Sequence, residues 1–136
     1  MKPFSNGELR IDACALSSTR FRLDWRGRSA SREPGVDLRP YLAELLTEAQ
    51  RSRASIEMHF EALEYFNSST VSVLVDCVRS ACAQKVPVKV FYAADIRWQR
   101  LSFDALRVFS LMDQNIAVTP IGVQVKAGPP GLVARG

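Results

Sequence analysis

"IEMHFEALEYFNSSTVSVLVDCV", residues 56–78, decides the fold, because its pattern changes from that of a strand to that of a helix. Up to Phe60 the apolar side chains alternate with polar ones, which is the period of a half-buried β-strand. From Val71 onward the apolar residues recur at helical spacing. The stretch therefore predicts a strand over residues 55–66 that leads, through the polar residues 67–70, directly into a helix.

The chain before this stretch predicts two strands, a loop and a helix. Residues 8–14 and 20–26 both alternate apolar and polar side chains, as half-buried strands do. Residues 27–35 are rich in Gly, Ser and Pro and predict a loop. Helical spacing of apolar residues begins at Asp37, which we expect to be the N-cap of a helix ending within residues 50–53.

The chain after it predicts a strand at residues 86–94, a helix at 97–112 and a short strand at 115–123. The predicted order is β-β-α-β-α-β-α-β, an α/β fold with a mixed β-sheet of about four to five strands and helices packed on it. We expect one domain over residues 1–123. Residues 124–136 are rich in Gly and Pro, and we expect them to form a flexible C-terminal tail.

Composition is that of a single globular domain, with 136 residues, 47% hydrophobic and 24% charged. No apolar run approaches the roughly 20 residues that a membrane-spanning helix needs. The N-terminus lacks the apolar core of a secretory signal. We therefore expect a cytoplasmic protein without membrane insertion.

The net charge of +4 allows an acidic partner or a nucleic acid. Acidic residues are mixed among the arginines, however, and the sequence contains neither an aromatic RNA-binding motif nor a helix-turn-helix pattern. Nucleic-acid binding rests on charge alone, so we interpret the excess as a mildly basic, solvated surface and expect no nucleic-acid partner.

Residues that could carry catalysis are few. The cysteines, Cys14, Cys77 and Cys82, lack the spacing of a metal site, and we expect them to be buried thiols. His59 is the only histidine and lies on the polar side of its strand. Glycine-rich nucleotide loops and zinc-ligand pairs are missing from the sequence, and Ser68 has no evident general base. We therefore expect no enzymatic activity, no metal and no cofactor.

The four polar residues at 67–70 have two interpretations. Asn67 or Ser68 can cap the helix, a contribution of about 1 kcal/mol, but one cap residue is enough. A helix N-terminus also favours negative charge, so a phosphate on a hydroxyl here would leave the helix folded while changing the surface. The residues alone leave both interpretations open.

The segment 56–78 resembles the core of a STAS domain, the fold of bacterial anti-sigma factor antagonists, in which a strand leads through Asp-Ser-Ser-Gly into an apolar helix. The predicted order of elements matches this family to about residue 123. The resemblance implies that Ser68 is the phosphoacceptor and Ser69 the reserve candidate. Asn67 replaces the family's Asp and Thr70 replaces its Gly, and Asn67, Ser69 and Thr70 form the environment of the phosphosite.

The same stretch is also similar to a related group of STAS-like bacterial phosphoproteins that regulate a diguanylate cyclase. Their motif reads Leu-x-Tyr-Leu-Asn-Thr-Ser-Ser. Leu63, Tyr65 and Asn67 fit it, and Ser68 stands where the acceptor threonine would be. Both resemblances imply the same acceptor position but different effectors.

The function that these resemblances imply is partner switching. The unphosphorylated protein would bind a serine/threonine protein kinase of the anti-sigma-factor type, or another effector such as a diguanylate cyclase. Phosphorylation of Ser68 would release the partner, and a metal-dependent serine phosphatase would restore binding. Exposed helix positions Ser72, Asp76 and Arg79 are the expected partner contacts. The alternative is a structural STAS module of a larger complex that is never phosphorylated.

Overall fold

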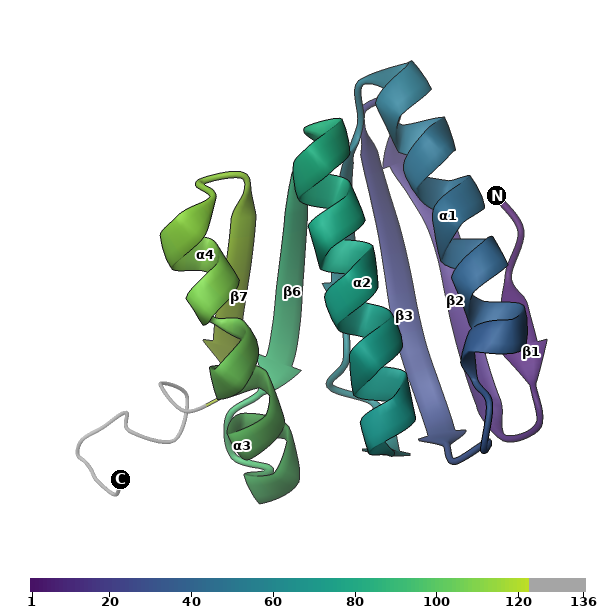
Figure 1. The fold of residues 1–136 in the computed structure, drawn as a ribbon, viewed down its shortest axis with the longest axis vertical. Helices are drawn as coiled ribbons and strands as arrows, with labels where there is room; N and C mark the ends of the chain where they lie inside the picture. Colours follow the sequence, from purple (N-terminus) through teal and green to yellow (C-terminus); the bar gives the residue numbers. More distant parts are fainter. Residues whose placement is uncertain (123–136) are drawn as a thin grey trace.

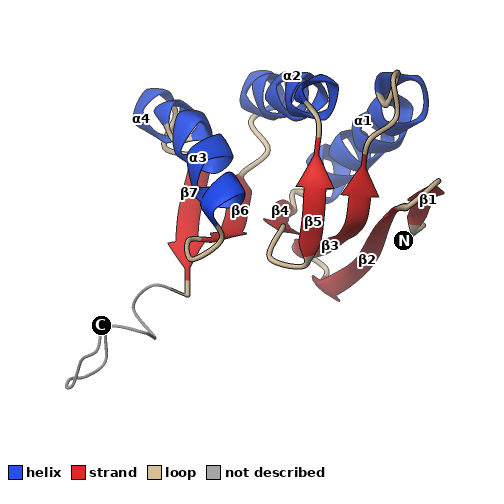
Figure 2. Ribbon diagram, turned by 90° about the horizontal axis from the view of Figure 1, so that it is seen from below, coloured by secondary structure: helices blue, strands red, loops and turns tan. Residues whose placement is uncertain are grey.

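The computed structural model describes residues 1–122, which form a seven-stranded sheet with all their helices on one face (Figures 1 and 2). The strands are β1 (Phe4–Asn6), β2 (Leu9–Ser17), β3 (Arg20–Ser29), β4 (Ser55–His59), β5 (Leu63–Phe66), β6 (Val88–Ala93) and β7 (Ile116–Ile121). The helices are α1 (Gly35–Ser52), α2 (Ser68–Gln84), α3 (Arg97–Leu106) and α4 (Val108–Met112). Every helix of the described chain is too short or too polar to traverse a lipid bilayer. The tail expected at residues 124–136 lies outside the described residues, as does the expected domain boundary.

The sheet is mixed, which confirms the predicted fold class. Its strand order is β1-β2-β3-β4-β6-β7, and β5 pairs with β3 beyond the end of β4. The pairings β1–β2 and β2–β3 are antiparallel, and all later pairings are parallel. In the centre of the sheet, Met58 of β4 lies between Leu23 of β3 and Val90 of β6. All three side chains point into the core beneath the helices.

The sheet has more strands than the four to five predicted. One reason is the short strand β1, and the other is that the stretch expected as one strand over residues 55–66 is two strands, β4 and β5. Buried Gln99 stabilises the break: its Nε2 donates to the carbonyls of Phe60 at 2.7 Å and Leu63 at 3.0 Å. Its Oε1 accepts from the N–H of Ala93 at 2.8 Å, so this one side chain ties the turn to β6 and α3.

Two helices also differ from their expected form. The helix predicted over residues 97–112 bends at Arg107, whose N–H bonds the carbonyl of Asp104 three residues earlier, and continues as α4. Helix α1 begins at Gly35, so the expectation that Asp37 caps it is wrong. Pro34 precedes the helix instead, because its restricted φ suits a helix start. Asp37 lies in the first turn, where its carboxylate accepts from Asn6 Nδ2 at 2.9 Å.

The core lies between the sheet and the helices and is centred on aromatic rings. Phe60 packs against Trp25 and against Phe103, with ring centroids 4.8 Å apart in both pairs. Tyr92 stacks on Phe103 at 5.3 Å. Because these rings come from β3, β6, α3 and the turn after β4, their contacts hold α3 against the sheet on which α2 also packs.

No described helix lies on the second face of the sheet (Figure 2), and that face carries paired polar side chains. Glu57 of β4 accepts from Arg20 at 2.7 Å, and Arg22 pairs with Asp24 at 3.0 Å. His59 lies on this face, as its place in the alternation predicts, and stacks on Phe91 at 4.6 Å. The open face is therefore a network of ion pairs over a well-packed sheet.

The cysteines are buried to different extents. Cys77 is buried and Cys82 half-buried, but Cys14 is exposed, so the expectation of three buried thiols is wrong for Cys14. Cys14 pairs in register with Arg22, on the face of the sheet that no described helix covers. Burial raises the pKa of Cys77 to about 12, which keeps that thiol protonated and unreactive at neutral pH.

The Glu57–Arg20 pair predicts a pH-dependent contribution to stability. The hydrogen bond from Arg20 lowers the pKa of Glu57 and outweighs the effect of burial, which raises it. A lowered pKa stabilises the fold above the unfolded-state pKa of about 4.3, and this stabilisation is lost as the pH falls through the folded-state pKa.

We expect Glu57→Gln to lower the free energy of unfolding by about 1 kcal/mol at pH 7 and by less at pH 3, measured by urea denaturation. Glu44→Gln, at an exposed pair with Lys2, is the control and should change little at either pH. An equal loss for Glu57→Gln at both pH values would contradict the prediction.

Candidate functional site at the start of helix α2

Asn67 joins three segments of the chain at the start of α2. Its Oδ1 accepts from the N–H of Thr70 at 2.9 Å, which makes Asn67, one of the two cap candidates in the sequence, the N-cap of α2. Its Nδ2 donates to the carbonyl of Ser31 at 2.8 Å, and its backbone N–H donates to the carbonyl of Ser29 at 3.0 Å. The side chain therefore fixes the first turn of α2 against the segment that follows β3.

Thr70 completes this network from inside the helix. It is fully buried, and its hydroxyl donates to Asn67 Oδ1 at 2.8 Å. The hydroxyl of buried Ser29 lies 2.6 Å from Thr70 Oγ1. Because the single hydroxyl proton of Thr70 is donated to Asn67, Ser29 must supply the proton of the second bond. All three side chains are thus hydrogen-bonded, and two of them, Ser29 and Thr70, are buried.

The two departures from the STAS motif are explained by these contacts. An Asp at position 67 could accept from Thr70 but could not donate to the carbonyl of Ser31. A Gly at position 70 would leave the hydroxyl of Ser29 buried without this partner. Asn67 and Thr70 therefore act as a matched pair that links α2 to the end of β3.

Ser68 and Ser69 have the opposite environment. Both are exposed in the first turn of α2, where backbone N–H groups lack intrahelical acceptors. Neither side-chain hydroxyl has a hydrogen-bond partner among residues 1–122; the backbone carbonyl of Ser68 accepts from Ser72 Oγ at 3.3 Å. These two hydroxyls are available for modification, whereas Asn67 and Thr70 are already used for structure.

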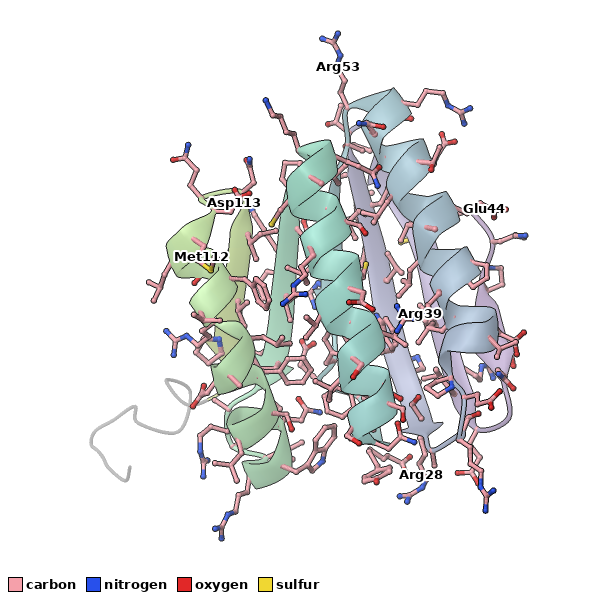
Figure 3. All side chains as sticks on the ribbon, in the orientation of Figure 1. Arg28, Arg39, Glu44, Arg53, Met112 and Asp113 are labelled. Atoms are coloured by element: carbon pink, nitrogen blue, oxygen red, sulfur yellow. The ribbon has the colours of Figure 1, made fainter. Side chains whose placement is uncertain are left out.

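Three arginines lie near the first turn of α2. A groove of about 500 Å³ runs between α2 and the segment leading into α1, and it is lined by Ser69, Ser72, Val36, Arg32 and Arg39 among others. Arg28 lies 5.0 Å over the ring of Tyr65, just before the site. Figure 3 shows Arg39 between α1 and α2, and Arg28 below the start of α2. The groove carries both charges, because Glu33 also lines it and Arg39 pairs with Asp76.

The three expected partner residues lie on the same face of α2 as Ser68. Ser72 and Arg79 are exposed. Asp76 is half-exposed, and its carboxylate pairs with Arg39 of α1. Ser68, Ser72, Asp76 and Arg79 are spaced by four, four and three residues, so they share one face of the helix. The structure thus brings the sequence-predicted residues together on one surface, with Asp76 held by α1.

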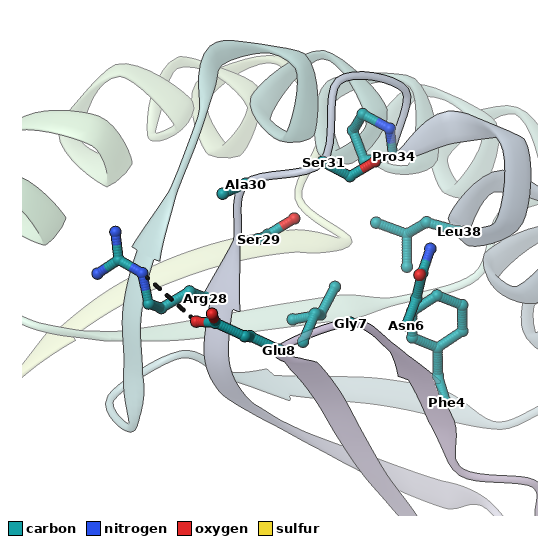
Figure 4. A pocket seen from close by; sticks show the side chains of 11 residues that line it. Phe4, Asn6, Gly7, Glu8, Arg28, Ser29, Ala30, Ser31, Pro34 and Leu38 are labelled. Atoms are coloured by element: carbon teal, nitrogen blue, oxygen red, sulfur yellow. Dashed lines mark ion pairs between the residues drawn. The ribbon is translucent and has the colours of Figure 1, made fainter.

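The sequence did not predict the residues at the end of β3 that contact the start of α2. Ser29 and Ser31 lie within a stretch that the sequence marks only as a loop, and their contacts with α2 span about forty positions of chain. The same segment borders a cavity of about 260 Å³ next to the turn between β1 and β2 (Figure 4). Glu8 and Arg28 form an ion pair at its rim, with 3.6 Å between Oε1 and Nε.

Metal-binding and catalytic residues do not gather at this site. The described part of the chain contains no group of three or more His, Cys, Asp or Glu side chains that could hold a metal ion. His59 pairs in register with Asp24 of β3, on the face of the sheet opposite the core, so its side chain points away from Ser68.

Comparisons with known proteins identify the fold. No family model matches the sequence, and no curated protein matches it. The solved structure of the anti-sigma factor antagonist SpoIIAA in its unphosphorylated form is similar, with a TM-score of 0.54 and 10% identity over 85% of this chain and 92% of that chain. SiaC from Pseudomonas aeruginosa, solved in complex with the diguanylate cyclase SiaD that it activates, is similar with a TM-score of 0.59 and 16% identity over 89% of this chain and 100% of that chain. The protein therefore has a STAS-like fold.

Thr70→Val tests the network at the start of α2. The substitution keeps the shape of the side chain but removes the hydroxyl, which leaves the Ser29 hydroxyl buried without its partner. We expect a loss of about 1–3 kcal/mol in the free energy of unfolding, measured by urea denaturation. Ser69→Ala, in the same turn but exposed, should change stability by less than about 0.5 kcal/mol.

The double variant Ser29→Ala with Thr70→Val tests the coupling within the network. Removing both hydroxyls takes away the unsatisfied group, so the double variant should lose less than the sum of the two single losses. Additive losses would show that the two hydroxyls do not interact.

Proposed function

We propose that this protein is a phosphorylation-controlled partner-switching regulator whose phosphoacceptor is Ser68. The observation that carries the proposal is that the residues that cap α2 are different from the residue whose hydroxyl is exposed. Asn67 and Thr70 provide the cap and the link to β3, while the exposed hydroxyl of Ser68 makes no hydrogen bond among residues 1–122. A phosphate on Ser68 would therefore add charge without breaking a structural contact.

The electrostatics of the site favour such a modification. A phosphoserine carries about −1.5 to −2 charges at neutral pH, and the N-terminus of a helix stabilises negative charge. Arg32 and Arg39 line the groove beside this turn, and Arg28 lies over Tyr65 immediately before it. The phosphorylated state would thus remain folded and differ mainly in the surface that it presents.

The switch follows from the face of α2 that carries Ser68. In the unphosphorylated state, Ser72, Asp76 and Arg79 would contact a serine/threonine kinase of the anti-sigma-factor type. Phosphate on Ser68 would place a double negative charge in that contact and release the partner. A metal-dependent serine phosphatase would reverse the change. In this proposal the protein is cytoplasmic and is not itself an enzyme, and the likeness to SpoIIAA supports it.

A diguanylate cyclase is the second candidate partner, and a specific observation favours it. Leu63, Tyr65 and Asn67 fit the motif of the cyclase-regulating phosphoproteins, and Asn67 makes a bond to the Ser31 carbonyl that an Asp could not make. The likeness to SiaC covers the whole of that chain. Ser68 stands at the acceptor position of both motifs, so a test of its phosphorylation applies to both candidate partners.

Phosphorylation is tested by mass spectrometry of the protein purified from its own host. We expect phosphate on the peptide that contains residues 67–70, lost in Ser68→Ala and retained in Ser69→Ala. Affinity capture should recover a kinase or a cyclase with the wild-type protein and with Ser68→Ala, and recover it at least about tenfold less with Ser68→Asp.

Two results would contradict this proposal. Phosphate retained in Ser68→Ala but lost in Ser69→Ala would move the acceptor to Ser69. No phosphate in any growth phase, with the same partners captured by all variants, would instead indicate a structural STAS module of a larger complex.

A further inference from the structure

Strand β2 has an unpaired outer edge over its second half. The short strand β1 pairs with β2 only from Leu9 to Ile11. The residues before β1 leave the sheet: the carbonyl of Lys2 accepts from the Tyr41 hydroxyl of α1 at 2.8 Å instead of pairing with β2. The rest of β2, as far as Ser17, therefore has one neighbouring strand among residues 1–122, which is β3 on its other side.

The register of the sheet identifies which backbone groups are unpaired. Residues of an antiparallel strand turn their N–H and C=O alternately to one neighbour and to the other. The N–H of Arg28 donates to the carbonyl of Glu8, so the even-numbered residues of β2 bond to β3 as far as Cys14. Ala13 and Ala15 turn their backbone groups to the outer edge, where no residue of the described chain bonds them. Each of these alanines therefore offers one N–H and one C=O to an added strand.

The opposite edge of the sheet, formed by β7, is protected against such pairing (Figure 1). The odd-numbered residues of β7 bond to β6, so Ile116, Val118 and Pro120 face outward. Pro120 has no N–H, and the N–H of Ile116 already donates to the carbonyl of Asp113. Proline is a usual means of blocking a sheet edge, and residues 12–17 of β2 contain none. The edge of β2 is therefore open to an added strand in a way that the edge of β7 is not.

An apolar groove lies beside the unpaired edge. It has a volume of about 530 Å³ and is bounded by β2, β3 and α1, with Ala15, Phe21 and Leu45 among its lining residues. Phe21 and Leu45 are only 5% and 8% exposed, so they form its floor. Ala13 and Ala15 point to the same face of the sheet as Ile11 of the core, because side chains alternate along a strand. Their small side chains leave open the space that larger residues would fill.

The backbone groups and the groove together select an extended peptide. A strand that pairs with the two alanines places every second side chain on their face of the sheet, and hence in the groove. Charge does not select the occupant, because the carboxylates at the rim, Glu44 and Glu48, already pair with Lys2 and Arg51. A second copy of the chain, paired through its own β2 edge, would bring alanines to this face and leave the groove unfilled. An extended segment with large apolar side chains satisfies both features.

We propose that the edge of β2 at Ala13 and Ala15, with the adjoining groove, is a docking site for an extended segment of a partner protein. The segment would pair its backbone with β2 and insert large apolar side chains from every second residue, which is recognition by β-strand addition. No residue of α2 lines the groove. The proposal therefore does not rest on phosphorylation of Ser68.

The test measures the binding of synthetic peptides to the full-length protein. The probe is a labelled peptide of about eight residues, the length of an ordinary strand, in which Leu alternates with Thr. Two matched peptides carry N-methyl groups on the amides of either the Leu or the Thr residues, so each loses the donors of one edge only. Fluorescence anisotropy should show one methylated peptide binding at least about tenfold more weakly than the unmodified peptide, and the other within about threefold of it.

Hydrogen exchange of the protein's own amides locates the bound peptide. In the free protein, Ala13 and Ala15 should exchange faster than Asp12 and Cys14, whose N–H groups bond to β3. Saturating unmodified peptide should slow the exchange of Ala13 and Ala15 by at least about tenfold. The exchange of Val118, on the opposite edge, should stay the same.

Matched variants separate docking from misfolding. Ala15→Phe should fill the groove and weaken peptide binding by at least about tenfold. Cys14→Phe adds the same ring one residue earlier, on the other face of the sheet, and should bind as the wild type does. Both positions are exposed, so both variants should keep the wild-type melting temperature. Ala13→Pro removes an outward N–H without removing a bond to β3, and it should weaken binding as well.

Three results would overturn the proposal. They are absence of binding by the unmodified peptide, equal binding of the two methylated peptides, and exchange of Ala13 and Ala15 that the peptide leaves unchanged. A dimer that sedimentation detects and that Ala13→Pro dissociates would also overturn it, since a second copy would then occupy the edge.

Discussion

Asn67 bonds to three parts of the chain at once, and the site depends on it. Its oxygen caps α2, its amide group holds the segment after β3, and its backbone N–H extends the pairing of β5 with β3. Thr70 and Ser29 close the network from the buried side. Because Ser29 and Thr70 are buried, neither hydroxyl can be lost without leaving the other without this partner.

Because of this arrangement, the two serines between Asn67 and Thr70 are not needed as caps. Ser68 and Ser69 lie in the same turn as the cap, yet neither hydroxyl contributes to it. A helix terminus that needed its serines for capping would lose stability when one was phosphorylated. Here the cap is provided by Asn67, so the surface can change charge while the fold stays the same. The departures from the Asp-Ser-Ser-Gly motif are therefore compatible with the proposed switch.

Most of the fold could be predicted from the sequence, because hydrophobic period is a local signal that each strand and helix carries in its own residues. The break between β4 and β5 could not, since the carbonyls of Phe60 and Leu63 are satisfied by Gln99, which lies more than thirty residues away. The site shows the same limit. Ser68 was found from its local motif, whereas Ser29 and Ser31 were missed because nothing in a loop sequence indicates which distant helix it will contact.

The central claim is that phosphate on Ser68 changes the surface and leaves the fold intact. The direct measurement compares amide NMR spectra and hydrogen exchange of the protein with and without phosphoserine at position 68. The account predicts shift changes confined to the first turn of α2 and the adjoining segment 31–39, with unchanged protection of the strand amides. Widespread shift changes, or loss of protection in β4 and β6, would contradict it, because phosphorylation would then act by unfolding the domain.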